Sequence, residues 1–160
     1  MIKNLFITLV LFICCMNIIN GQQMDNQKLD AIIYTLSDEV EGTNGSWQFL
    51  IDSTVFICLT DQINNRMRII SPIDKVENVS KEIMMECMEA NFHSALDVKY
   101  AVSDEIVWSV FIHPLKQLEK SQVIDAISQV YSASRTFGST YSSGALSFPS
   151  SNKEEDVYRN

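Results

Sequence analysis

Apolar positions near the start of the mixed-polarity part of the chain recur at the spacing of one helical face. Between residues 24 and 41 these positions are Leu29, Ile32, Ile33, Leu36 and Val40. Asp30, Asp38 and Glu39 are turned away from that face, as in a helix that packs one face against a core. The following Gly42 and Asn44-Gly45 indicate a turn that ends this predicted helix.

Three segments with strand character follow the turn. Residues 46–51 place Trp47, Phe49 and Ile51 on one side, and residues 54–60 are rich in branched and aromatic side chains. The two residues between these segments suit a tight hairpin, so the two strands are predicted to be antiparallel. We expect a third strand at residues 66–70, ended by Ser71-Pro72.

A second helix is predicted from about residue 74, because Asp74 and Glu77 have the spacing of a capping box. It carries two adjoining apolar stripes. One consists of Val76, Val79, Ile83, Cys87 and Ala90, and the other of Met84, Met88 and Phe92. Helical stripes usually pack in a core, whereas exposed methionine and aromatic side chains suit an interface, so the second stripe has two possible roles.

The rest of the chain predicts two strands and a final helix. Residues 96–102 alternate as in a half-buried strand, and residues 105–114 are apolar on both faces, which predicts a central strand covered on both sides. A helix is expected over residues 119–136. The pattern therefore predicts an α+β domain at residues 22–138, with the order α-β-β-β-α-β-β-α and a five-stranded antiparallel sheet. Residues 139–160 are rich in serine and predict a flexible tail.

The run ECMEANFHSALDVKYAVSDEIVWSVFIHPLKQL, residues 86–118, carries a resemblance to a known fold. With the element order, it resembles the type III secretion chaperone-like fold, which includes the Tir-chaperone and YbjN-type domain families, over residues 24–138. The resemblance implies a domain that binds another protein or peptide, commonly as a homodimer and without a cofactor. None of the shared motifs carries catalytic chemistry.

The first residues have the pattern of an export signal. Lys3 precedes an apolar run at residues 5–16, and the chain turns polar at Gln22. We expect residues 1–21 to be a signal peptide cleaved before Gln22, which makes the protein exported, either periplasmic or secreted. A retained anchor is the alternative, but the run is shorter than the roughly 20 apolar residues that span a bilayer. Secretion chaperones act in the cytosol, so export would set this chain apart from them.

Composition and charge limit the classes of partner that the protein can bind. The chain has 160 residues, 46% of them hydrophobic, with a formal net charge of −8. This is globular composition of one domain's length, and the acidic balance disfavours nucleic acid and anionic membranes as partners. Cys58 and Cys87 remain after signal cleavage and could pair or stay buried as free thiols. Asn44 and Asn78 lie in glycosylation sequons that matter only in a eukaryotic host.

Motifs for chemistry are lacking in the sequence. It contains no glycine-rich phosphate loop, no metal-ligand spacing and no nucleophile elbow, and His93 and His113 have no partner at motif spacing. We therefore predict no catalytic, cofactor-binding or metal-binding residues. The favoured function is a non-enzymatic, exported protein-binding domain, homodimeric through Met84, Met88 and Phe92. The alternative is a small secreted hydrolase or ligand-binding domain with a pocket between sheet and helices.

Overall fold

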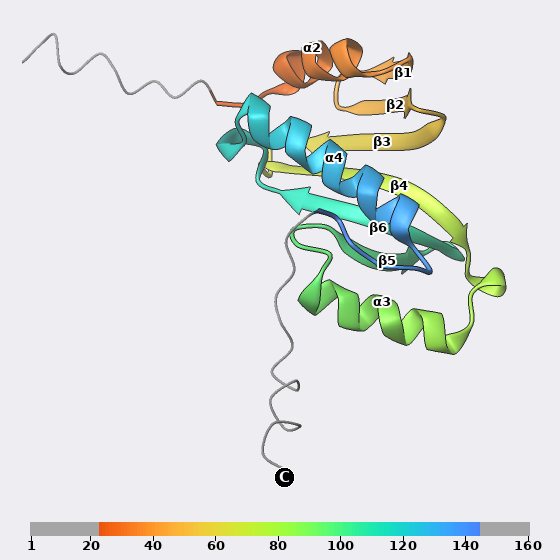
Figure 1. Cartoon of the computed structure of the whole chain (residues 1–160). Helices are drawn as coiled ribbons and strands as arrows, with labels where there is room; N and C mark the ends of the chain where they lie inside the picture. The colour runs from red at the N-terminus through yellow and green to blue at the C-terminus, as the bar shows by residue number, and fades with distance from the viewer. Residues whose placement is uncertain (1–22, 145–160) are drawn as a thin grey trace, which may run out of the picture.

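A computed structural model describes residues 23–144, in which three α-helices accompany one six-stranded antiparallel sheet (Figure 1). The elements in chain order are α2 (Asn26–Leu36), β1 (Glu39–Thr43), β2 (Ser46–Ile51), β3 (Thr54–Asp61), β4 (Arg66–Lys75), α3 (Lys81–His93), β5 (Lys99–Ser103), β6 (Ile106–His113) and α4 (Lys120–Thr136). The strands lie in the order β1-β2-β3-β4-β6-β5. The predicted α+β class and the antiparallel sheet are confirmed.

The sixth strand, β1, differs from the sequence prediction, which places Val40 in the preceding helix. That helix ends at Leu36, and Ser37 is already extended. The turn Asn44-Gly45 has positive φ at both residues, 56° and 100°, which is the geometry of a two-residue hairpin. The turn therefore pairs the segments on either side of it, with Thr43 opposite Ser46. The prediction of five strands is wrong because Val40, although it fits a helical period, lies in a strand that pairs with β2 across this turn.

The boundary between the third predicted strand and the second helix also differs from the prediction. β4 continues through Pro72 to Lys75, and α3 begins at Lys81 with Ser80 as its N-cap. β3 pairs with β4 only as far as Ile70, so Pro72 has a strand partner on the β6 side and none on the β3 side. A proline, which has no N–H to donate, is tolerated where one side of the strand is unpaired. Asp74 caps no α-helix; its carboxylate accepts hydrogen bonds from the Lys75 amide and the Asn78 side chain.

The core lies between the sheet and α4, which crosses one face of the sheet, here called the inner face (Figure 1). The buried inner-face residues include Trp47, Phe49, Phe56, Cys58, Met67, Ile69, Tyr100 and Phe111. Ser71 and Ser109 are fully buried beneath α4, and the Ser109 hydroxyl donates to the Val130 carbonyl of that helix at 3.2 Å. Side chains this small let the helix approach the sheet closely.

Among residues 23–144, a helix covers only one face of the strand β6. Val107, Ser109 and Phe111 are buried on the inner face, whereas Trp108 is half-buried and Ile112 is 60% exposed on the other. The prediction that both faces are covered was wrong, because the apolar residues on the second face shield one another across the strands instead of packing under a helix. We call this second face the outer face of the sheet.

Residues 137–144, here called the C-terminal strap, fasten α3 to the rest of the molecule. The Tyr141 hydroxyl donates to the Glu86 carboxylate of α3, and the Ser143 hydroxyl donates to the Ala95 carbonyl at 2.6 Å. The Tyr141 ring is buried beside the rings of Tyr100 and Phe137. The packed domain therefore continues past the expected boundary at residue 138 to Gly144. The expected signal peptide at 1–21 and residues 145–160 of the expected tail lie outside the described residues.

The strap generates a stability prediction. We expect Tyr141→Ala to lower the free energy of unfolding by about 3 kcal/mol, because it deletes a buried ring and the hydrogen bond to Glu86. Urea denaturation of the purified protein measures this. Thr140→Ala, at an exposed neighbouring position, is the control and should stay within about 0.5 kcal/mol of wild type. Equal effects of the two substitutions would mean that the strap does not unfold together with the domain.

The two buried tyrosines give the fold a dependence on alkaline pH. Burial raises the pKa of Tyr100 to about 12, and burial together with the Glu86 carboxylate raises the pKa of Tyr141. An unfolded tyrosine loses its proton near pH 10. Between pH 10 and 12 the unfolded state thus binds fewer protons than the folded state, and stability falls as pH rises.

We therefore expect the free energy of unfolding to be insensitive to these two tyrosines below pH 10 and to decline between pH 10 and 12. Tyr141→Phe should make that decline shallower, since the side chain that titrates in the unfolded chain is gone. Urea midpoints measured at several pH values test this. Tyr34→Phe, at an exposed site on α2, is the control, and a slope equally altered by it would contradict the assignment.

Candidate functional site

Within residues 23–144, the helix α3 presents an apolar surface that no other element covers, formed by the exposed Met85, Met88 and Phe92 with the half-buried Met84 at its margin, here called the α3 apolar face. Met88 is 61% exposed and Phe92 is 78% exposed. Cys87 and Ala90, on the opposite side of the helix, are buried against the domain. One side of α3 therefore packs on the core while large apolar side chains point away from it.

Local sequence explains how α3 is formed and held. Ser80 accepts a hydrogen bond from the Ile83 amide at 3.3 Å, which satisfies a free donor at the first turn. Near the other end, the Asn91 side chain makes two hydrogen bonds with the backbone of Tyr100 in β5, at 3.1 and 2.7 Å. This pair of hydrogen bonds to the edge strand, together with the C-terminal strap, fixes which side of α3 faces outward.

The sequence predicted Met84, Met88 and Phe92 as an interface. The structure places Met88 and Phe92 on the exposed side, and Met84 is half-buried at its margin. Met85, 61% exposed, belongs to the same surface and was missed. Its spacing of three and seven residues from Met88 and Phe92 was the available signal, because residues so spaced share one helical face.

Acidic side chains border the α3 apolar face on one side. Glu82 and Glu89 are exposed along the helix, and Glu86 is bound to Tyr141. Hydrogen bonds from the backbone and Ser80 at the start of α3 lower the pKa of Glu82. The surface therefore combines adaptable apolar side chains with acidic side chains along one border.

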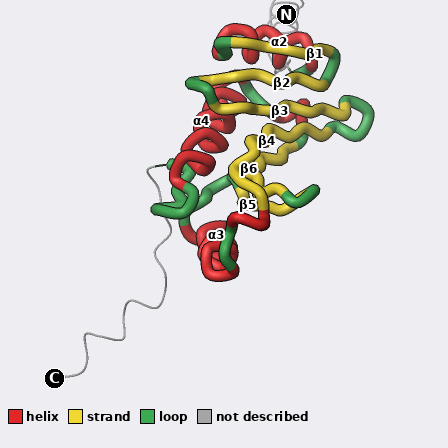
Figure 2. The backbone as a smooth tube through the Cα atoms, turned by 90° about the vertical axis from the view of Figure 1, so that its right-hand side faces the viewer, coloured by secondary structure: helices red, strands yellow, loops and turns green. Residues whose placement is uncertain are grey.

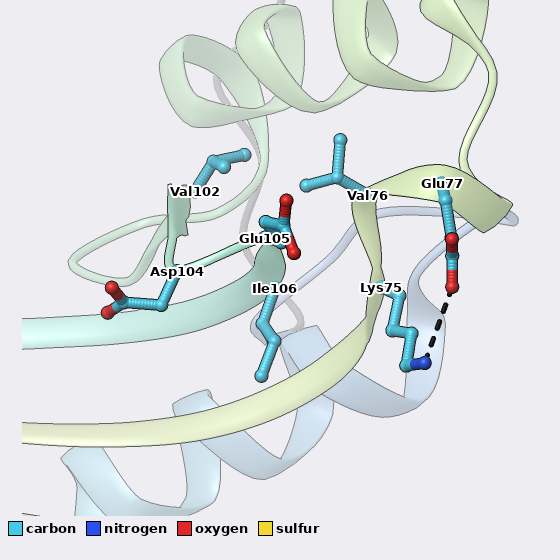
Figure 3. Close-up of a pocket in the computed structure, with 7 residues that line it drawn as sticks. All are labelled: Lys75, Val76, Glu77, Val102, Asp104, Glu105 and Ile106. Atoms are coloured by element: carbon cyan, nitrogen blue, oxygen red, sulfur yellow. Dashed lines mark ion pairs between the residues drawn. The ribbon is translucent and has the colours of Figure 1, made fainter.

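A cavity of about 670 Å³ lies where β4 leaves the sheet and the β5–β6 turn approaches it (Figure 3). It is lined by Lys75, Val76, Glu77, Val102, Asp104, Glu105 and Ile106. The Lys75 ammonium and the Glu77 carboxylate are 3.3 Å apart and largely exposed, so their attraction is screened by water. The lining offers three carboxylates and one ammonium group but no histidine, cysteine or serine.

The two histidines of the described residues, His93 and His113, lie in different parts of the structure. His113 lines a different cavity of about 280 Å³ with Asp97 and Asp125, and its Nδ1 lies 2.9 Å from the Pro114 carbonyl. His93 is on α3 with its ring against Phe92. Neither histidine lies in a site with a cysteine or serine at hydrogen-bonding distance in residues 23–144.

Cys58 and Cys87, the cysteines of the described residues, are free thiols and do not pair with each other. Burial raises the pKa of Cys58 to about 12 and that of Cys87 to about 11. Thiols with such pKa values remain protonated at neutral pH and are poor nucleophiles. Their role is packing in the core.

The described residues also contain neither a metal-binding cluster nor a membrane-spanning helix. No group of three or more His, Cys, Asp and Glu side chains there could hold a metal ion. Within residues 23–144, no helix is long and apolar enough to cross a bilayer. Two cavities in residues 23–144 are lined by both layers: one of about 280 Å³ by Phe111, His113 and Asp125 among others, and one of about 230 Å³ by Ile51, Ile127 and Tyr131 among others. The alternative prediction of a pocket between sheet and helices stays a prediction.

Comparison with solved structures identifies the fold. The chain is similar to the HopA1-SchA chaperone-effector complex, with a TM-score of 0.54, 10% identity and coverage of 68% of this chain and 88% of the other. It is also similar to the Yersinia pestis type III secretion chaperone SycH in complex with a fragment of YscM2, with a TM-score of 0.54, 13% identity and coverage of 70% and 98%. A third match is the ExsC-ExsE complex, with a TM-score of 0.53, 10% identity and coverage of 68% and 90%.

These similarities establish a type III secretion chaperone-like fold, as the resemblance in the sequence predicted. At 10–13% identity they concern the fold alone. Neither a protein-family model nor a curated protein matches the sequence. The likeness to YbjN-type domains stays a prediction.

Proposed function

We propose that this chain is a non-enzymatic protein-binding domain, chaperone- or adaptor-like in action, that forms a homodimer through the α3 apolar face. The observation that carries the proposal is the exposure of Met85, Met88 and Phe92 on the side of α3 opposite its packed side. Two of the similar structures are described as complexes of a chaperone with another protein, which supports a protein partner for this fold.

The energetics of the α3 apolar face suit self-association. A two-fold axis brings the same patch of both subunits together, so both copies of each exposed side chain are buried in the dimer. Burying one such side chain contributes roughly 1.5–3 kcal/mol. Three from each subunit are together comparable with the cost of association, about 4–15 kcal/mol. The acidic border places like charges near the interface, so added salt should favour the dimer.

We expect Met88→Asp to convert the dimer into a folded monomer, since desolvating an ionised carboxylate in the centre of an apolar interface is costly. Sedimentation equilibrium gives the mass and circular dichroism reports folding. Ile63→Asp, at a turn position that is 94% exposed, is the matched control and should leave the mass unchanged. A wild-type protein that stays monomeric at high concentration contradicts the dimer, and unfolding of Met88→Asp contradicts the exposure of this side chain.

We further propose that the protein acts after export, with residues 1–21 removed as a signal peptide. The support is the cationic start and the short apolar run before Gln22. Mass spectrometry of the protein from its native host should show a chain that begins at or near Gln22 in the periplasm or the medium. An intact Met1 on cytosolic protein contradicts export.

A further inference from the structure

The outer face of the sheet carries an apolar band that no helix covers within residues 23–144. Figure 2 shows α4 on one side of the strands and only strands and turns on the other. The band lies on β3, β4 and β6, the central strands of the sheet. It consists of Ile57, Leu59, Ile70, Trp108, Val110 and Ile112.

Strand register makes this band continuous. Ile57, Ile70 and Val110 are direct neighbours across the three strands and form one row. In the next row the order is Leu59, Arg68 and Ile112. Because neighbouring strands lie about 4.8 Å apart, each row is about 10 Å wide, which matches the diameter of an α-helix.

Arg68 places a positive charge inside the apolar band. It is exposed and has no ion-pair or hydrogen-bond partner for its side chain within the described range. Arg66, its neighbour on the same side of β4, is likewise exposed. Asp61, opposite Arg66, is already bonded to Asn64. This is a cationic spot on a chain whose net charge is −8.

The strand pairing and the charge of the apolar band favour one kind of ligand over two others. An extended peptide cannot pair there, because β3, β4 and β6 each have strand neighbours on both sides. A second copy packed about a two-fold axis would bring the arginines of both copies to one interface, where like charges repel. An amphipathic helix satisfies its own backbone and needs only a side-chain surface, and a carboxylate on it would meet Arg68.

We propose that the outer face of the sheet binds an acidic amphipathic helix of a partner protein, with apolar side chains on the band and carboxylates on Arg68 and Arg66. The inference rests on the proposed protein-binding function and names the surface and chemistry of its partner. It uses a different surface from the α3 apolar face, so one chain can dimerise through α3 and bind a partner through the sheet.

The two tryptophans provide a reporter for this surface. Trp108 is half-buried on the outer face, with its indole nitrogen donating to the Ser103 carbonyl at 3.1 Å. Trp47, the other tryptophan of the chain, is buried on the inner face and donates to Asp30. A ligand on the outer face therefore changes the fluorescence of Trp108, and Trp108→Phe should abolish the signal.

The probes are two synthetic helical peptides of about 18 residues, long enough to hold helical structure. Both carry leucines at positions i, i+3, i+4 and i+7, and one has glutamates where the other has lysines. Titrated into the mature chain, the glutamate peptide should bind saturably and at least about tenfold more tightly than the lysine peptide. Arg68→Glu should reverse that preference, and Ile112→Asp should weaken the glutamate peptide at least about tenfold. Lys120→Glu, an exposed charge reversal at the start of α4, is the control and should change nothing.

Absence of binding by either peptide, equal affinities for both, or no response to Arg68→Glu overturns the proposal. Other occupants are tested with Ile112→Cys, because the native thiols Cys58 and Cys87 are buried. The introduced thiol should react with iodoacetamide at the rate of an exposed cysteine. Protection at every concentration would assign the face to this chain's own residues, and protection only at high concentration would assign it to a second copy; either overturns the proposal.

The proposals for the α3 apolar face and for the outer face of the sheet are tested by separate measurements. Arg68→Glu and Ile112→Asp should leave the sedimentation mass of the dimer unchanged, and Met88→Asp should leave peptide binding unchanged. Loss of the peptide result with a persistent dimer defeats only the inference about the sheet. A monomeric wild type that still binds the glutamate peptide defeats the α3 interface and leaves the sheet surface in place.

Discussion

The close packing of α4 on one face of the sheet is the constraint on which the rest of the structure depends. Ser71 and Ser109 leave room for the helix, and Trp47, Phe56 and other large side chains around them fill the space between the layers. With only one layer of helices among the described residues, the sheet has a covered face and an open face. The strand residues that alternate toward α4 make the core, and those that alternate away from it make a surface available to partners.

The position of α3 is a second consequence of this architecture. α3 does not lie across the inner face, which α4 occupies; it packs at the β5 edge of the sheet (Figure 1). There it is held by the hydrogen bonds of Asn91 to Tyr100 and of Tyr141 to Glu86. A helix held from one side at an edge keeps its opposite side free. The α3 apolar face and the outer sheet face are thus two products of one packing arrangement, and they are different in charge: acidic on α3 and cationic around Arg68.

Much of the local structure could be predicted from the sequence. β2 has the predicted bounds, and the alternation of Trp47 and Phe49 correctly places them on one buried face. The exposed positions of Met88 and Phe92 follow a stripe visible in the sequence. Two predictions are wrong where local signals compete. Val40 fits a helical period but precedes a hairpin turn, and it lies in β1. Pro72 indicates the end of a strand, but β4 continues through it along β6.

The sequence by itself determined which residues share a side of each helix and strand, because side-chain direction follows the period of the local backbone. Only the tertiary structure decided which of those sides are covered. That outcome depends on contacts between distant segments, such as Tyr141 with Glu86 and Ser143 with Ala95, 55 and 48 positions apart. Periodicity carries no information about such contacts. For this reason Tyr141 was expected in a flexible tail although it is buried, and Ile112 was expected in the interior although it lies on an open face of the sheet.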